Sequence, residues 1–488
     1  MPLRDRSPTT SPFRLSWFFL TCWLLSIAVS CSQGEVATDT SLKKGAQPAD
    51  DAKSAPADGT IENATGPRDD AKHHTPASGH APHGADAAQA RVDQHQCPPE
   101  QANQDHAPPV QGDQHQPSTA NQHDATKTDH EPSTHARDAP HRSEHSAATG
   151  TGIRVTTVPV PEGGRPVAAK TGADGSLHLL YGSADGPQYA KSTDNGRTFG
   201  APVAVVDQAS RKPGLEFDAW DMAVGPGGVV HVALGTNAWK LKLPQEEWGY
   251  YYARLEPGAK AFSKLRNINR TPSEGFSLAC DEKGKVTACW LKDKLYANVS
   301  LDNGKTFADN AEIDASFDPC NCCTTSSIYG ADGKLAVLYR EETNNERDMF
   351  LVSWDQERNQ VSRTRVSGTL WNIEACPMSY YTISRDQEGF VAVWPTKDEI
   401  FFARLDGQGK PLPPKETKTP GKSGMRTGII ALSAPDGSSL VAWKKDEQLG
   451  WQLYDGKGRP SGSPGSAPSS GSGVAGVVDD RGDFILFR

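Results

Sequence analysis

Residues 151 to 488 repeat a pair of short apolar segments joined by a polar turn that contains glycine. The turn glycines stand 45 to 56 residues apart, at positions 175, 228, 284, 333, 389, 437 and 482. Apolar and polar residues alternate within the segments, which is typical of β-strands, and no segment has a helical period. A repeat of this length suits four-stranded blades arranged around an axis. The pattern therefore predicts an all-β fold of the propeller type.

The preceding part of the chain has no such pattern. From residue 32 to about residue 150 there is no Phe, Trp or Tyr, and Ala, Pro, Asp, Gln and Ser are frequent. Such a composition cannot bury enough apolar surface to offset chain entropy, so we predict that residues 31–150 form a disordered tether. Twelve of the fourteen histidines lie here, between His73 and His145. They are either a solvated spacer or a weak, collective site for Zn²⁺, Cu²⁺ or Ni²⁺.

The first thirty residues indicate export. Three arginines precede an apolar run from Leu15 to Val29, which is short for a membrane span and typical of a signal peptide. The run ends in Ala28-Val29-Ser30-Cys31, which resembles a bacterial lipobox. The resemblance implies that residues 1–30 are removed, that Cys31 is lipidated, and that the lipid anchors the protein to the outer membrane or cell surface. An ordinary secretory signal is the alternative, and both destinations allow disulfides.

Two turns in the repeats carry a sharper pattern, at residues 192–199 (STDNGRTF) and 300–307 (SLDNGKTF). Each resembles the Asp box of the sialidase superfamily. In each turn we expect the Asp to accept backbone N–H bonds, the Gly to adopt a positive φ, and the Phe to anchor the hairpin. These residues are Asp194, Gly196, Phe199, Asp302, Gly304 and Phe307.

The resemblance implies a sialidase-like β-propeller over residues 151–488. Sialidases have six blades, whereas seven hairpins occur here, so we expect six blades with seven as the alternative. We expect the last hairpin to pair with the strand around Ile153 to Val160 and so to close the ring.

The resemblance also implies a position for a catalytic site, where inner strands begin and second strands end. Sialidases use three arginines for the substrate carboxylate, a Tyr–Glu nucleophile pair and an Asp acid/base. The residues that match these roles are Arg165, Asp185, Arg340 and Arg426.

Two departures from the sialidase pattern put hydrolysis in doubt. Cysteines occupy the position of the glutamate, and no tyrosine follows Arg426 at the start of an inner strand. Tyr380 and Tyr381, near Glu374, offer only a rearranged pair. We therefore expect a propeller that binds a carbohydrate or protein ligand, with an active exo-sialidase as the alternative.

Six cysteines lie within the repeats. Cys280 and Cys289 flank one hairpin, but the expected register separates them by about 13 Å at ~3.3 Å per residue, beyond disulfide reach. Strand direction places five cysteines on the face that would hold the catalytic site, with Met378 close to the last of them. These five are Cys289, Cys320, Cys322, Cys323 and Cys376.

This cysteine group has two interpretations. In an exported protein the first is a disulfide, from Cys320 or Cys322 to Cys376, with at least one thiol left over. The second is a site for copper or zinc, because thiolates and a thioether suit Cu(I). If the cysteines bind metal, they and the histidine-rich tether would together serve a third function, copper or zinc handling.

The net charge of the chain is −9, and the sequence has no basic stripe, which argues against a nucleic-acid partner. We also expect the protein to be a monomer.

Overall fold

The structure is a computed structural model that describes residues 147–148, 152–316 and 318–488. The predicted signal peptide, the lipidation site Cys31 and the histidine-rich tract lie outside these residues. Among the described residues, no helix has both the length and the apolar character needed to cross a membrane.

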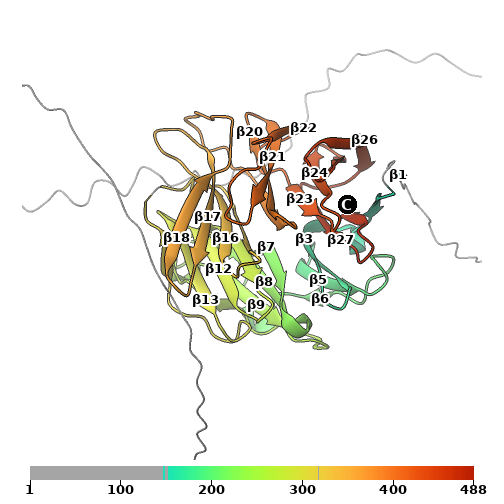
Figure 1. Cartoon of the computed structure of the whole chain (residues 1–488). Helices are drawn as coiled ribbons and strands as arrows, with labels where there is room; N and C mark the ends of the chain where they lie inside the picture. Colours follow the sequence, from blue (N-terminus) through green and yellow to red (C-terminus); the bar gives the residue numbers. More distant parts are fainter. Residues whose placement is uncertain (1–146, 149–151, 317) are drawn as a thin grey trace, which may run out of the picture. The chain divides into compact units, whose positions relative to one another are not determined.

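The described chain forms seven four-stranded sheets, the blades of a β-propeller (Figure 1). From the innermost strand outward, blades 1 to 3 contain β3 (Arg165–Thr171), β4 (Leu177–Ser183), β5 (Gly186–Ser192) and β6 (Val203–Ala204); β7 (Phe217–Val224), β8 (Val230–Thr236), β9 (Tyr251–Leu255) and β10 (Arg266–Asn267); and β11 (Glu274–Cys280), β12 (Val286–Leu291), β13 (Leu295–Ser300) and β14 (Ala311–Asp314).

The next three blades have the same plan. Blades 4 to 6 contain β15 (Thr325–Tyr329), β16 (Leu335–Arg340), β17 (Met349–Asp355) and β18 (Gln360–Arg365); β19 (Thr382–Arg385), β20 (Gly389–Thr396), β21 (Glu399–Asp406) and β22 (Thr417–Lys422); and β23 (Ile429–Ser433), β24 (Ser439–Lys445), β25 (Gln448–Tyr454) and β26 (Pro460–Pro468). The helices of the described residues are short 3₁₀ turns, η1 (Pro161–Gly163), η2 (Gln208–Ser210), η3 (Pro226–Gly228) and η4 (Gln245–Glu247).

The seventh blade joins the two ends of the described chain. Its strands, in spatial order, are β1 (Ala147–Ala148), β2 (Arg154–Val158), β28 (Phe484–Phe487) and β27 (Ala475–Val478). β2 and β28 pair in parallel, and the Arg154 guanidinium donates to the Asp483 carboxylate over 2.7 and 3.0 Å. Figure 1 shows the teal β3 beside the red β27, where the ring closes.

The last hairpin therefore pairs with the strand near residue 153, as predicted, but the number of blades is seven rather than six. The six-blade expectation was wrong because this hairpin and two N-terminal strands complete a sheet of their own. β1 lies ahead of residue 151, where we had expected the domain to begin.

The hydrophobic core lies between neighbouring blades. Some middle strands, such as β12 and β16, are buried along their whole length, because both of their faces meet other blades. Between blades 4 and 5, for example, the buried core includes Leu338, Leu351, Phe390 and Trp394. This packing rigidly positions the loops at the two faces of the ring.

The two faces of the ring differ in their loops. Within each blade the neighbouring strands are antiparallel, so the start of the inner strand and the end of the second strand lie at the same edge. We call the face formed by these edges the entry face. The opposite face carries the glycine-containing hairpin turns, and we call it the turn face.

Both predicted Asp boxes form the same turn on the turn face. Asp302 accepts hydrogen bonds from Ser300 Oγ, the Thr306 backbone N–H and Thr306 Oγ1, over 2.7, 2.8 and 2.6 Å. Gly304 has φ 77°, and the Phe307 ring packs edge-on against Tyr252. The turn at residues 192–199 repeats this arrangement: Asp194 accepts from the equivalent Ser and Thr groups, Gly196 has φ 78°, and Phe199 packs against Phe487.

Candidate functional site: a four-cysteine cluster

Two neighbouring loops of the entry face bring four cysteines together. Cys320, Cys322 and Cys323 precede β15 in blade 4, and Cys376 precedes β19 in blade 5; we call these residues the four-cysteine cluster. Cys322 and Cys376 form a disulfide with a Cα–Cα distance of 6.7 Å, and Cys320 and Cys323 are thiols. The Sγ atom of Cys320 lies 2.8 Å from that of Cys323. It lies 3.9 and 3.8 Å from the two disulfide sulfurs of Cys322 and Cys376.

Hydrogen bonds hold the two loops independently of their sulfur atoms. The backbone N–H of Cys320 donates to the Arg340 carbonyl over 2.8 Å, at the end of β16. The Thr324 N–H donates to the Ser379 carbonyl over 3.4 Å, which joins blade 4 to blade 5. Tyr381 strengthens this junction, because its hydroxyl accepts from the Arg340 N–H and donates to the Thr324 carbonyl. The loops are therefore positioned by the propeller itself.

Two buried guanidinium groups lie beside the thiols. Arg340 is fully buried, and its guanidinium donates to the carbonyls of Arg347 and Pro395 and lies 4.7 Å from the Trp371 ring centroid. Arg347 donates from Nη1 to the Sγ atom of Cys320 over 3.2 Å. Positive charge in a buried environment favours a thiolate over a thiol, so this site supports anionic sulfur.

The two thiols respond differently to this environment. The hydrogen bond with Cys323, followed by burial, raises the pKa of Cys320 well above its usual value. For Cys323, burial alone would raise the pKa, but the hydrogen bond from Cys320 and the charge of Arg340 outweigh it and lower the pKa to about 7. The pair therefore loses its first proton more readily from Cys323 than from Cys320.

Three buried polar atoms around the cluster have no hydrogen-bond partner. They are the Asn321 Oδ1, Ser379 Oγ and Arg340 Nε atoms, in the two cysteine loops and directly beneath them. Buried polar atoms are nearly always paired in folded proteins, so each of these three calls for an explanation.

The four residues matched to sialidase catalytic roles do not form one site. Arg340 is a structural residue, because its guanidinium is fully buried and bound to backbone carbonyls. Arg165 is an exposed residue at the start of β3, and Asp185 is an exposed turn residue between β4 and β5. Arg426 lies by the Cys376 loop, where its Nε donates to the Met378 Sδ over 3.3 Å. The expected use of Arg340 as a surface carboxylate ligand is therefore wrong.

Tyr381, one of the two tyrosines offered for a rearranged nucleophile pair, is also structural. Tyr381 is buried, and its hydroxyl is engaged by Arg340 and Thr324. Burial raises its pKa well above the usual value, which opposes formation of the phenolate that would attack a substrate.

Cys289 lies apart from the other predicted cysteines. It is fully buried in β12, in the core between blades 3 and 4, where burial raises its pKa to about 12. Cys280 and Cys289 are separate thiols, and Cys280 pairs with Val286 rather than with Lys285. The expectation that Cys289 ends its strand at the entry face was wrong, because Cys289 lies within β12, paired with Ser277 and Ala297, and is buried at the blade interface.

Arg347 is the functional residue that sequence reasoning missed. It reaches Cys320 because the chain reverses between β16 and β17, and its Nε donates to the Ile373 carbonyl. No local sequence signal marks it, since its partners lie 27 and 26 residues away.

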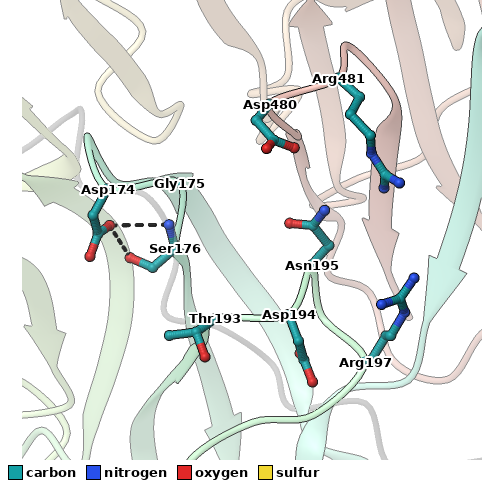
Figure 2. Close-up of a pocket in the computed structure, with 9 residues that line it drawn as sticks. All are labelled: Asp174, Gly175, Ser176, Thr193, Asp194, Asn195, Arg197, Asp480 and Arg481. Atoms are coloured by element: carbon teal, nitrogen blue, oxygen red, sulfur yellow. Dashed lines mark hydrogen bonds between the residues drawn. The ribbon is translucent and has the colours of Figure 1, made fainter.

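A second concave site lies on the turn face, between blades 1 and 7 (Figure 2). This cavity of about 300 Å³ is polar, and Figure 2 shows Asp480 and Arg481 across from Asn195 and Arg197. Ser176 at its edge contacts the buried His178 over 3.1 Å, and His178 contacts the Tyr189 hydroxyl over 2.8 Å.

The histidine beneath this cavity has a structural explanation. Blade 2 repeats the pair, with His231 Nδ1 at 2.7 Å from the Tyr252 hydroxyl and Nε2 at 3.1 Å from Asn303. Burial lowers the pKa of both histidines to about 4, so they are neutral around pH 7. Their recurrence at one blade position indicates that they pack the blades.

Comparison with known proteins does not assign a family to this chain. No family model and no curated protein matches the sequence. A PL25 polysaccharide lyase, ulvan lyase, has a TM-score of 0.42 and 13% identity over 64% of this chain and 87% of its own. A streptogramin B lyase has a TM-score of 0.41 and 10% identity over 70% of this chain and 92% of its own. The Dos1 propeller has a TM-score of 0.41 and 13% identity over 66% of this chain and 78% of its own.

Proposed function

We propose that this propeller binds a soft metal ion, with Cu(I) the best match, through the four-cysteine cluster. The observation that most directly supports this proposal is the spacing of the sulfur atoms in the cluster. Metal–sulfur bonds of about 2.3 Å place neighbouring thiolates roughly 3.8–4.0 Å apart in tetrahedral or trigonal sites. Cys320 lies 3.8 and 3.9 Å from Cys376 and Cys322. For metal binding, the 2.8 Å contact with Cys323 has to open and the disulfide between Cys322 and Cys376 has to be reduced.

The charges around the cluster suit a bound Cu(I) ion. Three thiolates and one Cu(I) ion carry a net charge of −2, and buried negative charge needs compensation. Arg340 and Arg347 provide two positive charges beside the cluster. Zn²⁺ also accepts thiolates, but sulfur-only coordination with few ligands favours Cu(I).

Metal binding by Cys376 requires reduction of its disulfide. A dithiol reductant would supply two electrons and two protons, become a disulfide itself, and release Cys322 and Cys376 as thiols. Cys322 and Cys376 are half-buried, whereas Cys320 and Cys323 are buried, so the reducible bond is the one that a reductant can approach.

The proposed location follows from the N-terminal sequence. We propose that Cys31 carries lipid, that the protein is exported and anchored to a bacterial membrane, and that the histidine-rich tether collects metal ions more weakly than the cluster does. Imidazole ligands suit Cu²⁺ and Zn²⁺, whereas thiolates suit Cu(I), so the two regions would differ in the oxidation state that they prefer.

A carbohydrate or protein ligand on the entry face is a second proposal. Arg165 and Asp185 favour it, since both are exposed polar residues on that face. Sialidase-type hydrolysis has weaker support, because Arg340 cannot reach a substrate carboxylate. We expect a fluorogenic sialoside to remain intact with the wild-type protein. Turnover that disappears in Arg165→Ala would establish the enzyme instead.

Anaerobic competition for Cu(I) tests the metal proposal. The full-length protein is reduced with a phosphine, freed of it, and titrated against bicinchoninate. We expect Cys320→Ser to weaken binding of the tightest Cu(I) equivalent by about tenfold or more. Cys289→Ser is the matched control, because it removes a buried thiol outside the cluster. Equal affinity in the two variants would refute the proposed site.

A further inference from the structure

The polar cavity between blades 1 and 7 lies on the turn face, opposite the four-cysteine cluster. Its volume of about 300 Å³ is at the lower end for small-molecule sites, but polar side chains line it, whereas most such sites are mainly apolar. A ligand that suits it must therefore carry charged or hydrogen-bonding groups. We propose that this cavity binds the ammonium and carboxylate groups of a free amino acid, independently of any metal ion on the entry face.

The two Asp boxes meet their neighbouring blades in different ways. At the junction of blades 2 and 3, Asn303 contacts the Nε2 atom of His231 over 3.1 Å, and Arg266 donates to two carbonyls of the same Asp box over 2.6 Å each. At the junction of blades 7 and 1, the residue that corresponds to His231 is Ile485, which is buried and apolar. Asn195, which corresponds to Asn303, therefore has no histidine to contact at this junction.

The hairpin turn of blade 7 instead brings charged residues to the junction. Where blade 2 has Gly225, blade 7 has Asp479, and both donate their backbone N–H to the carbonyl four residues further on, over 2.8 and 2.9 Å. The Asp479 carboxylate accepts from Asn195 Nδ2 over 3.3 Å and from Arg481 Nε and Nη2 over 3.1 and 2.6 Å. Among the described residues, these bonds leave Asn195 Oδ1 as an acceptor and Arg481 Nη1 as a donor for a ligand.

The other charged groups of the cavity wall fall into two sets. Asp174 is paired with Lys191 over 3.0 Å, and Asp194 is bound within its own Asp box. In the part of the chain that the structure describes, the Arg197 guanidinium and the Asp480 carboxylate have no hydrogen bond or ion pair, and both residues are exposed. These two opposite charges are therefore available to a ligand.

The available groups form two sides of the cavity (Figure 2). The guanidinium groups of Arg197 and Arg481 point toward one another, and the Asp480 carboxylate points toward Asn195. The first side offers donors, which a carboxylate accepts in pairs of parallel bonds. The second side offers the acceptors of Asp480 and Asn195 Oδ1, and an ammonium group has three N–H donors and no acceptor. Together the two sides match the two charged groups of an amino acid.

The balance of charge also favours a zwitterion over a simple ion. Three aspartates and two arginines line the cavity, and their partners Lys191 and Asp479 have opposite charges, which leaves one net negative charge. A simple anion would be repelled by this excess, and a simple cation would leave Arg197 without a partner. A ligand with one charge of each sign satisfies both sides.

Three matched small molecules test the proposal on the full-length, metal-free protein. L-Serine has both charged groups, glycerate has a hydroxyl in place of the ammonium, and ethanolamine lacks the carboxylate. Their dissociation constants are measured at pH 7 by ligand-observed NMR titration. We expect serine to bind, and each analogue to bind about three- to fivefold more weakly, which is the contribution of one partly exposed charge pair. Absence of saturable serine binding, or equal affinity for serine and either analogue, would overturn the proposal without the need for a variant.

Two variants locate the charged groups of the ligand. Arg197→Gln should weaken serine binding about three- to fivefold and leave ethanolamine binding unchanged. Asp480→Asn should weaken serine binding without weakening that of glycerate. Lys305→Gln is the matched control, because Lys305 has the position of Arg197 in the other Asp box and is also exposed. An equal loss of serine affinity in Lys305→Gln and Arg197→Gln would refute the site.

Discussion

At the scale of single residues, burial determines which side chains can act at neutral pH. Arg340 was matched to a catalytic role because it ends a strand at the entry face, and that position is correct. Its role could not be predicted, because burial depends on Trp371 and Pro395, which are remote in sequence. His178 and His231 share one position, three residues after the turn glycine of their repeats, and both are buried.

The two buried histidines should make stability depend on pH. Burial lowers their pKa to about 4, from about 6.5 in an unfolded chain. Between these values the unfolded chain binds protons that the folded protein does not, so stability falls as pH falls from about 6.5 toward 4. At ~1.4 kcal/mol per pKa unit, each histidine costs roughly 3 kcal/mol by pH 4.

Urea unfolding at pH 7 and pH 4.5 measures this dependence. We expect His231→Gln to be less stable than the wild type at pH 7 but to lose about 2–3 kcal/mol less on acidification. The same loss in both proteins would show that folding does not lower the pKa of His231.

At the scale of elements, local patterns were predictable and contacts between blades were not. Every hydrogen bond of the Asp302 side chain joins it to a residue within four positions, so the turn could be predicted from eight letters. The four-cysteine cluster was placed on one face by strand direction alone. The separation of Cys289 from it depends on which side of β12 meets blade 4, and the sequence carries no clear signal for that.

Asp302 should stabilise its turn through its charge. Asp302→Asn keeps the size of the side chain but weakens its three accepted hydrogen bonds, and charge-assisted bonds are worth about 1.5–3 kcal/mol each. We expect a loss of roughly 1–3 kcal/mol in the free energy of unfolding, measured by urea titration. Asp309→Asn, at an exposed position nearby, should change it little. Equal effects would mean that the Asp box contributes nothing specific.

At the scale of the whole molecule, closure of the ring gives the blade count. The repeats predicted a propeller and the pairing of its ends, but the resemblance to sialidases favoured six blades. The seventh sheet exists because β1 and β2 add to the last hairpin, and β1 is too short to show a pattern. A two-residue strand is defined by its partner rather than by its own sequence.

Removal of the closing strand should open the ring. A chain that begins at residue 147 keeps β1 and β2, and we expect it to unfold cooperatively. A chain that begins at residue 159 lacks both strands and leaves Phe484 and Leu486, which are fully buried, without the partner strand β2. We expect this shorter chain to lose cooperative thermal unfolding, monitored by circular dichroism. Identical melting curves would show that the seventh blade does not hold the ring.

The central claim is that thiolates of the four-cysteine cluster bind Cu(I), and copper X-ray absorption on the full-length protein tests it most directly. With one equivalent of Cu(I), we predict sulfur scatterers alone at about 2.3 Å, and nitrogen scatterers once Cys320→Ser removes the central thiol. Nitrogen coordination in the wild type would contradict the account, because it would place the ion on the histidine-rich tether rather than on the propeller.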